Sequence, residues 1–99
     1  MYNEEEKMIK ITKKGLKAWV TFTIKPSEGE VVSISGEWND WKDEPMKVKK
    51  SGEVYITKVL SLGESYQFGY RVNENEWRCD STLECVQSPF GSQNSLLKL

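Results

Sequence analysis

Three of the four tryptophans in this 99-residue chain lie in segments that favour turns. Trp38 and Trp41 stand three residues apart in segment 36–41, and Trp77 follows the polar segment 73–76. A turn directs side chains at this spacing to different sides, so one can cap a core while the other faces water. A displayed indole suits the apolar C–H face of a pyranose, whose hydroxyls are bonded by nearby amides and charged groups. The pattern favours a sugar-binding surface, with local packing as the alternative because buried tryptophans are common in β-sandwiches.

The composition excludes several other chemistries. The chain has no histidine, which excludes a Ser-His-Asp triad, a Cys-His dyad and a histidine metal site. Its two cysteines, Cys79 and Cys85, cannot complete a four-ligand zinc site by themselves. In a reducing compartment we expect two free thiols, although the spacing also permits a disulfide and, less readily, a redox pair. We expect no metal and no cofactor.

Charge and hydropathy predict the cellular compartment, the class of partner and the domain organisation of the chain. It has 14 basic and 15 acidic residues and a net charge of −1, which disfavours nucleic acid as a partner. No apolar run approaches the length of a membrane span, and Met1–Lys7 lacks the features of a signal peptide. We therefore expect a cytoplasmic protein without a membrane partner. Residues 1–7 should be frayed, and residues 8–99 should form a single domain.

Apolar residues alternate with polar ones along most of the chain, which is typical of half-buried antiparallel strands. In segment 16–25, Leu16 and the alternate residues up to Ile24 share one face. No segment shows helical spacing. Residues 37–45 are expected to form a loop, and residues 81–93 an irregular segment. The expected strands cover residues 8–12, 16–25, 30–36, 46–50, 53–61, 66–72, 76–80 and 95–99, which predicts an all-β sandwich of about seven or eight strands.

The aromatic residues divide into core and surface candidates. Phe22, Phe68 and Tyr70 lie on apolar strand faces, where we expect core packing. Trp19 lies on the polar face of its strand, between Lys17 and Thr21. Three interpretations of Trp19 remain open: packing beneath the N-terminal segment, contact with a partner protein, and a platform for a ligand.

Three blocks resemble the family-48 carbohydrate-binding modules. They are Val32 to Trp41 (VSISGEWNDW), Tyr66 to Asn73 (YQFGYRVN) and Phe90 to Leu97 (FGSQNSLL). The family includes the glycogen-binding domain of the AMP-activated protein kinase β subunit and the early-set domains of isoamylases and branching enzymes. The resemblance covers residues 18–99. It implies an immunoglobulin-like, early-set β-sandwich that is non-catalytic and binds α-1,4-glucans such as glycogen, starch or malto-oligosaccharides.

The resemblance also implies the residues of a sugar site. Trp41 and Trp77 correspond to tryptophans that stack on consecutive glucose units, and Phe90 corresponds to a residue that inserts into the glucan coil. Ser92 and Asn94 correspond to the groups that bond the sugar hydroxyls. Trp38 takes the place of a core phenylalanine, so we expect it in the core.

The chain departs from the family pattern at two places. Gly69 stands where the family has a sugar-bonding lysine, and we expect Arg71, on the same strand face, to supply the missing donor. The turn before Trp77 is one residue longer than usual, and Glu74 and Glu76 place negative charge there. Both departures bear on the strength of glucan binding and leave the expected fold unchanged.

Two functions follow as hypotheses. In the first, the chain binds α-glucan and tethers a partner, such as an enzyme of glycogen metabolism, to the polymer. In the second, it is an interaction or scaffold domain without sugar binding, whose Trp19 face and edge strands meet another protein or a second copy in a homodimer. An enzyme is not expected, because no carboxylate pair is set apart by apolar surroundings as glycoside hydrolysis requires.

Overall fold

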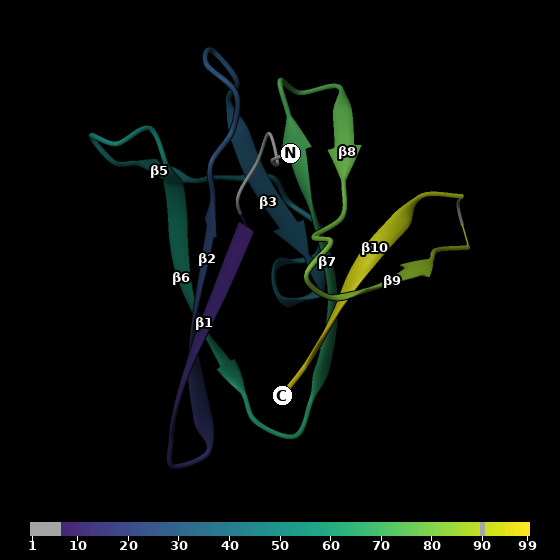
Figure 1. The fold of residues 1–99 in the computed structure, drawn as a ribbon. Helices are drawn as coiled ribbons and strands as arrows, with labels where there is room; N and C mark the ends of the chain where they lie inside the picture. The colour runs from purple at the N-terminus through teal and green to yellow at the C-terminus, as the bar shows by residue number, and fades with distance from the viewer. Residues whose placement is uncertain (1–6, 90) are drawn as a thin grey trace.

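The computed structural model describes residues 7–89 and 91–99, and within them the chain forms two antiparallel sheets packed face to face (Figure 1). This confirms the all-β, immunoglobulin-like sandwich. The first sheet, which we call sheet A, consists of β1 (Lys7–Lys14), β2 (Lys17–Ile24), β6 (Val54–Ser61) and β5 (Lys47–Val48), in that order. The second, sheet B, has the order β4 (Glu44–Pro45), β3 (Val32–Gly36), β7 (Ser65–Val72), β10 (Gln93–Lys98) and β9 (Glu84–Gln87), with β8 (Glu76–Arg78) paired to β7.

The core lies between the two sheets and is built from strand residues of period two. In β2 every second residue from Ala18 to Ile24 is fully buried, and β7 contributes Phe68, Tyr70 and Val72. Phe22 meets Phe68 edge to face, with ring centroids 5.0 Å apart. Trp38 packs on both rings and is partly buried, in line with the core position expected for it. The outward residues of β7, namely Gln67, Gly69 and Arg71, thereby face away from the core.

Some elements differ from the sequence-based expectation. Residues 81–93 are not irregular throughout, because Glu84–Gln87 forms the edge strand β9 against β10. The loop 37–45 contains a short 3₁₀ helix at Glu37–Asn39 and the two-residue strand β4. The short strands β4 and β9 form by pairing with β3 and β10, which local periodicity does not reveal. Leu16 is exposed because it lies in the β1–β2 turn, outside the strand.

The N-terminal strand lies beside Trp19 in the plane of sheet A. All eight residues of β1 pair with β2, with Thr12 opposite Trp19. Trp19 therefore stays 40% exposed, and in the described part of the chain the N-terminal segment does not cover it. The first six residues of the segment expected to be frayed lie outside the described residues. In the described ranges, no helix is long and apolar enough to cross a membrane.

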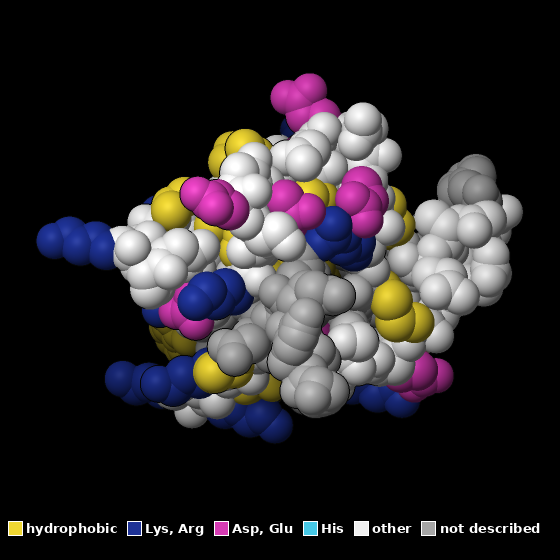
Figure 2. Space-filling view, turned by 45° about the horizontal axis from the view of Figure 1, so that its top comes forward, with side chains coloured by type: hydrophobic (Ala, Val, Ile, Leu, Met, Phe, Trp, Pro, Cys, Tyr) yellow, Lys and Arg dark blue, Asp and Glu magenta, His cyan; other side chains and the backbone are white. Residues whose placement is uncertain are grey.

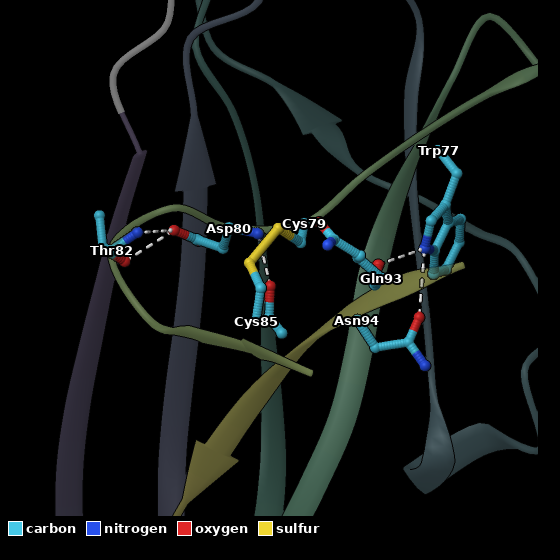
Figure 3. Close-up of a disulfide and its surroundings, with 8 residues drawn as sticks. Trp77, Cys79, Asp80, Thr82, Cys85, Gln93 and Asn94 are labelled. Carbon is cyan, nitrogen blue, oxygen red and sulfur yellow. Dashed lines mark hydrogen bonds between the residues drawn. A yellow bond between two sulfur atoms is a disulfide. The ribbon is translucent and has the colours of Figure 1, made fainter. Parts of the chain in front are cut away.

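The two cysteines are joined, which corrects the expectation of free thiols. Cys79 and Cys85 form a disulfide that links the segment after β8 to the edge strand β9 (Figure 3). Next to it, the fully buried Asp80 accepts hydrogen bonds from Tyr70 Oη at 2.9 Å and from Thr82 Oγ1 at 2.6 Å. The residue spacing permitted this bond, but the free-thiol expectation rested on an assumed reducing compartment.

Candidate functional site

An open groove of about 590 Å³ lies on the outer face of sheet B. Its floor consists of outward side chains of β3, β7, β8 and β10, and its walls come from the segment 37–43 and the β9–β10 turn. The lining residues are Ser35, Glu37, Trp41, Gln67, Arg71, Trp77, Ser88, Pro89, Ser92 and Asn94. The groove thus contains five of the six predicted site residues. The sixth, Phe90, lies outside the described residues.

Trp77 lies across the sheet, from β8 over β7 to β10. A Cβ atom at Gly69 would lie 2.3 Å from the indole, so the ring rests on the bare backbone of β7. At the far side of β7, Trp77 Nε1 donates to the Gln93 carbonyl at 3.0 Å and to Asn94 Oδ1 at 3.2 Å (Figure 3). These contacts hold the ring in one orientation.

Asn94 supports that orientation from beneath. Its side chain is nearly buried, with 4% of the residue exposed, and its Nδ2 donates to Gln67 Oε1 at 3.1 Å. Both ends of the Asn94 amide are therefore engaged by protein groups. Gln67 itself lines the groove, and Asn94 engages the Oε1 atom of its amide.

Trp41 reaches the groove from a backbone conformation that L residues seldom adopt. Asp40 and Trp41 have φ values of 59° and 62°, directly after the 3₁₀ helix. Two successive left-handed residues are costly and cluster at functional sites. The turn is held by Trp41 N–H donating to the Gly36 carbonyl at 2.9 Å. Trp41 is 41% exposed, and its ring centroid lies 6.2 Å from that of Trp77 with 52° between the planes.

Arg71 stands beside the two rings. Its guanidinium carbon lies 5.1 Å from the centroid of the Trp77 ring, within the range of a cation–π contact. Its Nε donates to the Asp43 carboxylate at 3.0 Å. Because both partners are partly exposed, this ion pair contributes little to stability, and its effect is to fix the direction of the guanidinium.

The β9–β10 turn carries Ser92 to the edge of the groove. Ser88 N–H donates to the Ser92 carbonyl at 2.8 Å, and the two serine Oγ atoms are 3.0 Å apart. Ser92 is exposed, so its hydroxyl is available to a ligand.

The negative charge expected next to Trp77 is largely compensated. Arg78 bonds Glu76 at 2.7 Å and Glu30 at 2.9 Å, on the side of β8 away from the groove residues. The hydrogen bond from Arg78 and, secondarily, its charge lower the pKa of the Glu76 carboxyl below its usual range. Glu74 is exposed in the β7–β8 turn, where φ is 69°.

Sequence reasoning missed five residues that line the groove, namely Ser35, Glu37, Gln67, Ser88 and Pro89. Gln67 shares a strand face with Gly69 and Arg71, so its position could have been found from the alternation alone. The position of Glu37 in the groove could not be predicted from local sequence. Its carboxylate accepts a hydrogen bond from the N–H of Gln67 at 2.7 Å, and the two residues are 30 positions apart. In the described ranges, no cluster of acidic or cysteine side chains could hold a metal ion.

Comparison with known proteins agrees with this geometry. The family described as the glycogen recognition site of AMP-activated protein kinase matches residues 18–99, which span β2 to β10 and the whole groove. None of the curated proteins compared with the chain matches it. The matched domain type is a non-catalytic carbohydrate-binding module, and its ligand is α-glucan polysaccharide. The chain therefore belongs to the family of glycogen-recognition, carbohydrate-binding modules.

Proposed function

We propose that the groove on sheet B binds α-1,4-glucan by stacking glucose rings on Trp41 and Trp77. The observation that carries this proposal is the convergence of the two indoles, 6.2 Å apart, in one open groove. Their planes meet at 52°, so the rings form a bent platform. A bent platform suits a chain that curves from one glucose to the next better than a straight, flat one.

The polar groups of the groove supply bonds to the sugar hydroxyls. Arg71 and Ser92 offer donors at the rim, and Gln67 offers its amide from the floor. Asn94 acts on the same site by holding Trp77, because its amide already bonds the indole and Gln67. In this proposal Asn94 is a positioning residue.

The biological consequence that we propose is tethering. A shallow, open site should bind weakly, with a dissociation constant between roughly 1 μM and 1 mM. Weak binding to a long polymer suits a module that carries a partner, such as an enzyme of glycogen metabolism, to stored glucan. The chain itself is proposed to be non-catalytic.

Calorimetric titration with maltoheptaose tests the proposal. We expect saturable binding by the wild type and roughly three- to tenfold weaker binding for Trp41→Ala and for Trp77→Ala, because each removes one stacking surface. Cellohexaose, whose β-1,4 linkage gives a straight chain, should bind far more weakly.

Trp19→Ala is the matched control, since it removes an indole from the opposite sheet. It should leave the affinity for maltoheptaose unchanged. No binding by the wild type at several millimolar sugar, or equal weakening by all three variants, would favour a scaffold domain that has lost its sugar site.

A further inference from the structure

The charges of the chain are distributed very unevenly over the two sheets. The four strands of sheet A contain seven lysines and no acidic residue, whereas all 15 Asp and Glu residues lie outside them. Figure 2 shows Lys and Arg side chains projecting at the left and lower left, the side on which Figure 1 places β1, β2, β5 and β6. By the strand register four of these lysines, Lys10, Lys14, Lys17 and Lys47, lie on the outer face of sheet A, which is therefore basic although the net charge of the chain is −1.

The outer face of sheet A has an apolar centre. Strand pairing places Trp19 between Thr12 of β1 and Val59 of β6, all pointing away from the core. Trp19 and Val59 are 40% and 51% exposed. Two large apolar side chains side by side on one exposed sheet face indicate an interaction surface. We call Trp19 and Val59 the apolar centre.

Lysines surround this centre on the same face. The register of β1 and β2 puts Lys10 opposite Thr21, and Lys14 opposite Lys17. Lys17 Nζ has Ser61 Oγ as a neighbour at 3.4 Å. Among the described residues, no carboxylate lies within ion-pair distance of Lys10, Lys14 or Lys17. An apolar centre with a charged rim is the arrangement found in protein–protein interfaces.

We propose that the outer face of sheet A docks an acidic protein surface that presents an apolar residue to Trp19. The positive rim selects and steers a negatively charged partner, and the exposed indole supplies the buried anchor. This proposal goes beyond glucan binding, because it concerns the opposite face of the sandwich and needs no sugar. If both proposals hold, one chain can bind polymer and partner at the same time.

The apolar centre favours a protein over a nucleic-acid partner. Val59 beside Trp19 is aliphatic and half exposed, and an apolar side chain of a protein partner can cover it. The net charge of −1 also disfavours a polyanion bound through its phosphates. A partner with carboxylates around an apolar residue therefore fits this face better than nucleic acid.

Fluorescence anisotropy with a labelled peptide tests the inference. The probe is a peptide of glutamates around a central Leu-Phe-Leu, titrated with the full chain at low and at physiological salt. We expect saturable binding that weakens with salt. Lys10→Glu with Lys17→Glu should weaken it about tenfold or more, and Trp19→Ser about threefold or more.

The matched control is Lys98→Glu, which reverses one exposed charge on sheet B. It should change the peptide affinity by less than about twofold, and saturating maltoheptaose should change it as little. Equal weakening by Lys98→Glu, or no effect of Trp19→Ser, would show general charge attraction and overturn the proposal. Tighter binding of a single-stranded DNA or of phosphatidylserine vesicles would overturn it as well, as would self-association of the chain that Trp19→Ser abolishes.

The two proposals fail in different ways. Loss of maltoheptaose binding with intact peptide binding would refute the glucan site alone. Loss of peptide binding with intact maltoheptaose binding would refute the docking face alone.

Discussion

The indole of Trp77 occupies the space that a side chain at Gly69 would fill. A Cβ atom at Gly69 would lie 2.3 Å from one ring atom and 2.6 Å from a second, too close for any residue other than glycine while the ring stays in place. The glycine at position 69 and the orientation of Trp77 therefore depend on each other. Removing the side chain from β7 lets the indole cross the strand and bond β10.

Gly69→Ala should displace Trp77 and weaken glucan binding. The added methyl group forces the ring off the strand, so the bonds to Gln93 and Asn94 lengthen or break. We expect the affinity for maltoheptaose to fall roughly three- to tenfold, as for Trp77→Ala, and the free energy of unfolding to fall by about 1–3 kcal/mol from overpacking. Calorimetry and urea denaturation measure the two effects.

A double-mutant cycle separates this mechanism from a general effect of alanine in β7. In the Trp77→Ala background no ring opposes the methyl group, so Gly69→Ala should change stability by less than about 0.5 kcal/mol. An equal cost in both backgrounds would show that Gly69 does not act through Trp77.

Arg71→Ala should weaken maltoheptaose binding several-fold while leaving stability within about 0.5 kcal/mol, since the ion pair with Asp43 is partly exposed. The affinity of Arg71→Lys for maltoheptaose should lie between those of the wild type and Arg71→Ala, because a lysine keeps the charge but loses the planar contact with Trp77. Calorimetric titration of the three proteins checks this order. An unchanged affinity in Arg71→Ala would mean that no donor at this position replaces the one absent from Gly69.

Much of the fold could be predicted from alternation. The inward residues of β2 and β7 form the core because their apolar side chains recur at every second position. Strand β9 could not be predicted in this way. The strand has only four residues, most of them exposed. It forms because it pairs with β10, where Ser95 lies opposite Cys85.

The candidate site was predicted in part. The resemblance predicted Trp41, Trp77, Ser92 and Asn94 as site residues, and the structure brings all four to one groove, while their contact with sugar stays a prediction. Local sequence could not show that Asn94 is buried and bonded to Trp77, because that contact spans 17 positions and depends on Gly69. The positive φ of Trp41, a residue whose side chain disfavours that conformation, had no signal in the sequence either.

Tyr70→Phe should destabilise the chain without changing the groove. Tyr70 and Asp80 are both fully buried, and the phenol donates to Asp80 Oδ2 at 2.9 Å. Removing one partner of a buried hydrogen bond costs about 1–3 kcal/mol, which urea denaturation should show as a lower midpoint. Tyr55→Phe, at a partly exposed position on the outer face of sheet A, is the control and should cost less than about 0.5 kcal/mol. Equal losses of stability in the two variants would show that the hydrogen bond from Tyr70 to Asp80 does not stabilise the fold.

The Cys79–Cys85 disulfide should stabilise the fold more than it supports binding. It closes a short loop, with a sequence separation of 6, and a loop of that size restricts the unfolded chain by about 2 kcal/mol. Replacing both cysteines by serine should therefore lower the free energy of unfolding by about that amount. The affinity for maltoheptaose should change by less than about twofold, because Trp77 remains fixed by Gly69, Gln93 and Asn94. A thiol reductant should lower the stability of the wild type to that of the serine variant and leave the variant unaffected. Equal urea midpoints for the reduced and oxidised wild type would contradict a stabilising role for the bond.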